Sequence, residues 1–201
     1  MDAYEVKLIE IADIRVGYQS RTRIDEKPEG NLTIIRPADF DNAGDIIFRA
    51  LKHFSPSPNI DILKDLIKMG DVLFQARGHN HQAYLIEEDL EKTVAANTFY
   101  IIRIKENVKI LPAYLTWLIN QPKLQVYFKK GQGVSTIPFI SKTVLAHAPV
   151  LISPLKVQEN IIKAIQLWHR EKGLLQQLIC KKEILIQEAA RKAAAYFKED
   201  K

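Results

Sequence analysis

Long hydrogen-bond donors gather on the parts of the sequence that are predicted to form loops. Arginine and glutamine can each donate two hydrogen bonds to a guanine or adenine edge, whereas lysine, serine, threonine and glycine amides hold phosphates. Taken singly, each of these side chains is explained as solvated surface. Together they form a candidate nucleic-acid-binding set, which comprises Arg21, Arg23, Arg36, Arg77, His79, Lys129, Lys130, Gln132, Ser135 and Thr136.

One stretch of this set, KKGQGVSTIPFIS at residues 129–141, stands between a helical pattern and a strand pattern. Its glycines free the backbone from side-chain steric limits and its lysines supply mobile positive charge, so an anion could approach it. A solvated turn between two packed elements explains the same residues, and the stretch alone favours that interpretation.

Motifs of nucleotide binding and methyl transfer are missing. The sequence contains no GxxxxGK[ST] phosphate loop, and GQG lacks the GxGxxG continuation of a dinucleotide site. NTFY at residues 97–100 lacks both prolines of the loop with which methyltransferases act on exocyclic amines. We therefore predict neither a nucleotide cofactor nor methylase activity.

Two weaker chemical signals have simpler explanations. His79 and His81 could share one face of an extended segment and bind a metal, but no third ligand has suitable spacing, and a solvated turn is favoured. Asp71 could belong to a nuclease carboxylate cluster, although the start of a strand explains it better. We predict no catalytic residues, no metal and no enzyme activity.

Positive charge is unevenly distributed along the chain. The formal net charge is +5; residues 1–154 hold 19 Lys and Arg against 18 Asp and Glu, a net of +1, whereas residues 155–201 hold 10 against 6, a net of +4. This mild excess is compatible with a nucleic-acid partner. The nearly neutral first part could bind phosphates only through a local patch, and firm binding would need help from a partner.

Cysteine use and hydropathy indicate the cytoplasm. Cys180 is the sole cysteine, so neither an internal disulfide nor a cysteine-based zinc cluster can form. The amino terminus MDAYEVKLIE lacks the positive start and apolar core of a signal peptide, and no window approaches the roughly 18 apolar residues of a membrane span. We expect a cytoplasmic protein that does not contact a membrane.

Short strands and helices must position the candidate donors. Strands are predicted where apolar residues alternate or run together between turn residues, and helices where they recur every three or four positions. In the opening VKLIEIADIRVG, a short strand or an entry turn would bring Val6, Leu8, Ile11 and Ile14 to the core, and a strand is favoured over a helix. The other predicted strands are NLTIIRP stopped by Pro37, DIIFRALKHF, VLFQAR after Gly70 and Asp71, TVAANTFYIIRIK as one buried strand, and LAHAPVLIS. The predicted helices are ILPAYLTWLIN, begun by Pro112, and LQVYFKK, ended by Gly131.

From Leu155 onward the sequence predicts a long amphipathic helix. About 40 helical residues extend roughly 60 Å at 1.5 Å per residue, too far for a small domain to cover, so we expect a coiled coil with a helix of another chain. A hairpin folded at Gly173 is the alternative, since one glycine costs only about 1 kcal/mol in a helix. The apolar stripe comprises Ile161, Ile165, Trp168, Leu175, Ile179, Ile186, Ala189 and Ala193, flanked by Leu174, Leu178 and Leu185.

Four motifs follow one another between the strand patterns and this helix. They are Gly70 to Leu73, Pro112 to Leu115, Gly131 to Thr136, and Pro154 to Gln158. Their order and spacing resemble the specificity subunit of type I restriction-modification systems, with its Gly-Asp-Ile/Val-Leu strand, Pro-x-Tyr/Phe-Leu helix, glycine-serine-threonine loop and Pro-x-x-x-Gln start of a conserved helix. The resemblance covers most of residues 66–188, whereas residues 1–65 match only loosely.

The resemblance implies an α+β fold and DNA binding without catalysis. A globular mixed α/β target recognition domain would occupy residues 1–154, and one long spacer and dimerisation helix would occupy residues 155–201. The implied partners are double-stranded DNA, methyltransferase (modification) subunits and a restriction endonuclease subunit.

The usual members of that family carry two recognition domains and two antiparallel spacer helices, whereas this sequence holds one of each. Two copies related by a two-fold axis could rebuild the full arrangement and recognise a palindromic split target. The residues expected to hold such a homodimer together are Ile161, Ile165, Trp168, Leu175, Ile179 and Ile186.

Two other classes of function stay open on the sequence alone. A protein-interaction adaptor, whose helix recruits a partner and whose globular part binds no DNA, is favoured by the near neutrality of residues 1–154. A nuclease that uses Asp71 is the weaker alternative.

Overall fold

The computed structural model describes residues 3–20, 29–41, 44, 46–47, 51–56, 62–133 and 136–199, with side chains as far as residue 194. Arg21, Arg23 and Ser135 of the predicted donor set lie outside these residues. The chain divides into two compact units, Met1–Glu159 and Asn160–Lys201. All strands among the described residues belong to the first unit, and most of one long helix forms the second.

A four-stranded antiparallel sheet carries much of the core of the first unit. Both faces of its strand β5 are covered, because Val72, Leu73 and Phe74 have no exposed surface. Burial on both faces explains why the predicted strand VLFQAR is an unbroken apolar run instead of an alternation. The sheet has the order β2 (Ala12–Val16), β8 (Phe99–Ile104), β5 (Val72–Gln75) and β6 (Ala83–Leu85).

The first unit also contains a three-stranded mixed sheet. Its middle strand, β3 (Leu32–Ile35), pairs antiparallel with β4 (Lys52–Phe54) and parallel with β7 (Thr93–Ala95). Pro37 ends β3 as predicted and begins the 3-10 turn η1 (Pro37–Asp39). Only the end of the predicted strand DIIFRALKHF is described as β4, since residues 45 and 48–50 lie outside the described residues. The order is β4 (Lys52–Phe54), β3 (Leu32–Ile35) and β7 (Thr93–Ala95).

The prediction of one buried strand in TVAANTFYIIRIK is wrong, because this segment passes from one sheet to the other. β7 pairs with β3, whereas β8 pairs with β2 and β5. Between them, the amide of Phe99 donates to the carbonyl oxygen of Ala96 at 2.9 Å and closes a turn. Asn97, a residue type that strands disfavour, lies in this turn.

The opening segment contains a helical turn as well as strands. One turn of helix, α1, separates β1 from β2, so the predicted single strand is wrong in its middle. Its apolar residues behave as predicted: Leu8, Ile11 and Ile14 are buried, and Val6 is half-buried. β1 (Tyr4–Lys7) pairs antiparallel with β9 (Pro149–Ile152), and α1 spans Leu8–Ile11.

Three short helices flank the candidate loop in the sequence, two before it and one after it. The predicted helices are confirmed as α2 (Pro112–Ile119) and α3 (Pro122–Lys130), each with a proline in its first turn, and Gly131 follows the last residue of α3. The predicted strand LAHAPVLIS is wrong in its first part, which belongs to α4 (Lys142–Ala146). The hydroxyl of Ser141 caps α4 by accepting from the amide of Val144 at 3.2 Å, and this polar cap outweighs the strand pattern.

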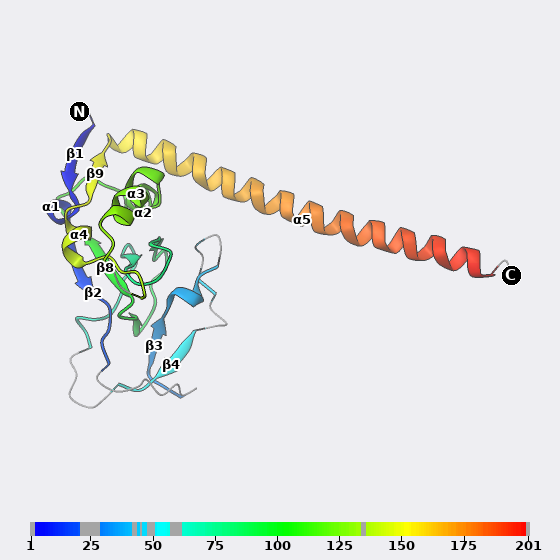
Figure 1. The fold of residues 1–201 in the computed structure, drawn as a ribbon, viewed down its shortest axis with the longest axis horizontal. Helices are drawn as coiled ribbons and strands as arrows, with labels where there is room; N and C mark the ends of the chain where they lie inside the picture. Colours follow the sequence, from blue (N-terminus) through cyan, green and yellow to red (C-terminus); the bar gives the residue numbers. More distant parts are fainter. Residues whose placement is uncertain are drawn as a thin grey trace. The chain divides into compact units, whose positions relative to one another are not determined.

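The long helix α5 runs uninterrupted over Leu155–Glu199 (Figure 1). It passes through Gly173 without a break, so the predicted hairpin alternative is excluded. A globular α+β part followed by one long helix confirms the predicted fold class. No helix among the described residues has the length and apolarity that crossing a membrane requires.

Candidate nucleic-acid interface

Two segments that are distant in sequence form one surface: the turn at residues 75–82, which begins at the last residue of β5, and the loop after α3, of which residues 131–133 and 136–140 are described. Their backbones are joined directly, so the loop is fixed to the end of a core strand. The hydrogen bonds run from Gly78 N to Pro138 O at 3.0 Å, from Ile140 N to Ala76 O at 2.8 Å and, within the loop, from Gly133 N to Phe139 O at 3.0 Å. Arg77 and Phe139 form an isolated antiparallel bridge.

Two glycines are required by the geometry of this surface. Gly78 has φ +114°, in the region that favours glycine. A Cβ atom at Gly133 would stand 2.4 Å from Cε1 of Phe139, so glycine at this position makes room for an aromatic ring. The loop therefore contains a packing glycine where the sequence suggested only free backbone.

His81 holds the two segments together from inside. The residue is 6% exposed, and its ring stacks on Phe74 with centroids 6.2 Å apart. With Nδ1 protonated, the ring donates to the carbonyl oxygen of Gln75 at 3.1 Å, and Nε2 accepts from the side-chain amide of Gln132 at 3.1 Å. Both ring nitrogens are used, so this histidine is not a metal ligand here. Across the described residues, no group of three His, Cys, Asp or Glu side chains could hold a metal ion.

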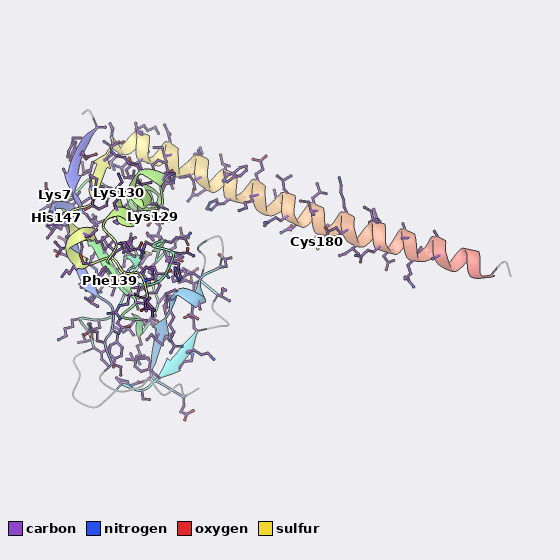
Figure 2. All side chains as sticks on the ribbon, viewed as in Figure 1. Lys7, Lys129, Lys130, Phe139, His147 and Cys180 are labelled. Carbon is purple, nitrogen blue, oxygen red and sulfur yellow. The ribbon has the colours of Figure 1, made fainter. Side chains whose placement is uncertain are left out.

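The ten predicted donors fall into four groups. Arg77, His79, Lys129, Lys130 and Thr136 are exposed on the two joined segments or on the last turn of α3 that leads into them. Figure 2 shows Lys129 and Lys130 at the end of that helix.

Gln132 is half-buried and uses its amide to bind His81, so its first role is to position the loop. Arg36 belongs to the other sheet, at the junction of β3 and η1, where its amide donates to Asp39 Oδ2 at 2.8 Å. The remaining three residues, Arg21, Arg23 and Ser135, lie outside the described residues.

Asp71 is fully occupied by structural partners. It is 1% exposed, and Arg103 binds it with two hydrogen bonds, Nε to Oδ1 at 2.7 Å and NH2 to Oδ2 at 2.6 Å. Arg15 lies 3.7 Å from Oδ2, and the amide of Lys68 donates to the same oxygen at 2.9 Å. The hydrogen bond to Asp71 raises the pKa of Arg103, whereas burial, followed by repulsion from Arg103, lowers the pKa of Arg15.

The stripe of α5 is open to solvent within the single chain. Trp168, Leu175, Ile179 and Ile186 are 57%, 49%, 57% and 67% exposed. Ile161 and Ile165, nearer the start of the helix, are partly exposed. Exposed apolar surface that continues over several turns marks an interaction site in a soluble protein.

Sequence reasoning missed the anchoring role of Gln158. Its side chain has no exposed surface and makes three hydrogen bonds: Oε1 accepts from Leu111 N at 2.8 Å, and Nε2 donates to the carbonyl oxygens of Lys109 at 3.0 Å and Ser153 at 2.7 Å. It fixes the first turn of α5 to the segment before α2. The spacing of Pro154 and Gln158 was the signal, but a glutamine in an amphipathic helix gives no sign of burial.

Comparison with known proteins identifies the family. The model of the type I restriction modification DNA specificity domain matches residues 1–179, and the chain belongs to this family. No curated protein matches the sequence.

Solved structures share the fold. The S subunit of a type I restriction-modification system from M. genitalium aligns with a TM-score of 0.58 at 10% identity, covering 89% of this chain and 42% of that chain. The HsdS subunit from Thermoanaerobacter tengcongensis aligns with a TM-score of 0.63 at 15% identity, covering 88% of this chain and 44% of that chain. A chain from a structure of complex assembly and conformational transition of the type I R-M system aligns with a TM-score of 0.64 at 16% identity, covering 92% of this chain and 43% of that chain. The present chain thus spans less than half the length of each of these relatives.

Proposed function

We propose that this protein recognises a specific double-stranded DNA sequence for a type I restriction-modification complex. It would carry no catalytic residues of its own and would direct methyltransferase and restriction endonuclease subunits to their target. The observation that carries this proposal is the family match over residues 1–179, which covers the globular part and more than half of α5. Residues 1–154 would be the target recognition domain and residues 155–201 the spacer helix.

The chain would act as a homodimer. An isologous pair of α5 helices would bury both exposed stripes, and a two-fold axis would place two recognition domains on a palindromic target in two parts. The exposed stripe of α5, with Trp168, Leu175 and Ile179 about half exposed in the single chain, supports this pairing.

Within each domain, the turn at 75–82 and the loop at 131–140 would face DNA. Arg77 has the planar fork of donors that guanine edges accept, and it is exposed beside the loop. Lys129, Lys130 and Thr136 would bind phosphates. His79 would contact the backbone from the neighbouring turn, and Gln132 would contribute by holding the loop in place.

Selection from a random duplex library, after a mobility shift at low salt, tests this function. Enrichment of a defined motif is the expected result. Absence of enrichment with the methyltransferase subunit present would favour the adaptor, which the near-neutral charge of residues 1–154 supports. Metal-dependent cleavage by the chain alone would favour a nuclease, for which the paired Asp71 offers no free carboxylate.

A further inference from the structure

The sequence contains a long stretch without negative charge. From Asn107 to Gln158, 52 residues include six lysines and no aspartate or glutamate, although the whole chain has 24 acidic residues. This stretch builds α2, α3, the loop at 131–140, α4 and β9. The near neutrality of residues 1–154 therefore conceals a local excess of positive charge.

The end of α3 and the short helix α4 lie against each other. The hydroxyl of Tyr127 donates to the carbonyl oxygen of Val144 at 2.9 Å. A Cβ atom at Gly131 would stand 2.7 Å from Cγ1 of the same valine. These contacts bring the last turn of α3, which carries Lys129 and Lys130, beside the helix that begins at Lys142.

The lysines at the end of α3 and the start of α4 have no ion pair within the described part of the chain. They are Lys129, Lys130 and Lys142, and all three are exposed. Two other lysines of the stretch differ, because Lys123 pairs with Glu5 at 2.9 Å and Lys156 with Glu159 at 3.6 Å. Figure 2 shows Lys129 and Lys130 in the part of the unit where α3 lies and Phe139 on the loop.

Helix stabilisation does not explain Lys142. Lys129 and Lys130 stand in the last turn of α3, where the helix dipole favours positive charge. Lys142 is the first residue of α4, where the dipole disfavours it. Lys142 is thus exposed, stands in an unfavourable position on a helix that packs against the end of α3, and has no acidic partner among the described residues, so an external anion would balance its charge.

We propose that Lys142 extends the DNA interface onto α4, so that the end of α3, the loop and α4 form one surface for the sugar-phosphate backbone of duplex DNA. This inference rests on the proposed function and adds a residue that was absent from the predicted donor set. DNA is favoured over an acidic protein because the loop between the lysines is joined to the turn that carries Arg77 and His79. Contacts of lysine with phosphate raise affinity for every sequence alike and carry no base preference.

The test is the salt dependence of binding of the full chain to its selected target and to a random duplex. We expect Lys142→Ala to weaken both by the same factor and to reduce the slope of log K against log salt by about 0.9, the value for one phosphate that the protein no longer neutralises. Lys142→Arg should restore the slope. Lys123→Ala is the matched control, since Glu5 already neutralises that lysine, and should leave the slope unchanged.

Different failures have different meanings. An unchanged slope in Lys142→Ala, with a wild-type protein that selects a motif, would overturn the inference and leave the proposed function standing. Weaker binding to the target alone would also overturn it, because Lys142 would then contact bases. A wild-type protein that binds no duplex would overturn the proposed function together with this inference. Thermal unfolding of each variant shows that the altered side chain and not misfolding causes the effect.

Discussion

At the scale of single residues, burial and pairing separate structural side chains from candidate binding residues. Asp71 and Arg77 stand in the same strand-and-turn segment, yet Asp71 is 1% exposed and bound by Arg103, while Arg77 is exposed. A buried carboxylate whose oxygens both accept from Arg103 serves as a structural ion-pair partner. An exposed guanidinium with a packed loop beside it is free to bind a ligand.

Replacement of Asp71 should therefore cost stability. We expect Asp71→Asn to lower the free energy of unfolding by about 3 kcal/mol, the low end for breaking a buried ion pair, because the two arginines are partly exposed and remain hydrated. Chemical denaturation measures the effect. Glu106→Gln, at an exposed position, is the control and should change stability little; an equal loss in both variants would show that the pair has no special role.

The lysines at the end of α3 should act on DNA without regard to sequence. We expect Lys129→Ala together with Lys130→Ala to weaken binding to all duplexes and to reduce the salt slope by about 0.9 for each phosphate that is no longer neutralised. Binding titrations at several salt concentrations measure it. A slope equal to that of the wild type would remove both lysines from the phosphate-binding set.

At the scale of elements, the sequence predicts regular segments well and junctions poorly. α2, α3 and α5 follow from apolar spacing with a proline or glycine at their ends. The segment at 93–104 was predicted as one strand because β7 and β8 are both apolar. Only their pairing with different partners shows that they are two strands. The start of the predicted strand LAHAPVLIS is wrong because its first two residues, Leu145 and Ala146, belong to α4, which the hydroxyl of Ser141 caps.

The candidate site shows the same limit. Exposed donors such as Arg77 and Lys130 could be predicted from residue type and from a position in a turn or at a helix end. The buried contact between His81 and Gln132 could not, because 51 residues separate the two and only the folded chain brings them together. Long-range polar contacts leave no periodic signal in a sequence.

Gln158 should anchor the first turn of α5. Gln158→Leu would leave one amide and two carbonyl groups without their partner, and an unsatisfied buried group costs about 1–3 kcal/mol. We expect a loss of about 3 kcal/mol in unfolding free energy and faster amide exchange at Leu111. Gln166→Leu, on the exposed part of the same helix, should show neither change. Slow exchange at Leu111 in the first variant would contradict the anchoring role.

At the scale of the whole molecule, the exposed stripe of α5 is the basis of the proposed dimer. We expect Ile165→Asp, Leu175→Asp and Ile179→Asp together to convert a dimer into a monomer, because three carboxylates cannot be buried in an apolar seam. Light scattering gives the mass. Gln166→Asp, Gln177→Asp and Ile184→Asp form the matched control, since about 100° per residue places them on the opposite side of the helix. A mass unchanged by the first triple variant would refute pairing through the stripe.

The architecture of the selected DNA motif tests the central claim most directly. Selection from a random duplex library by the wild-type chain, followed by sequencing, should return two half-sites related by two-fold symmetry and separated by a constant number of unspecified base pairs. A single undivided motif, or half-sites at variable separation, would contradict a pair of recognition domains held apart by their helices.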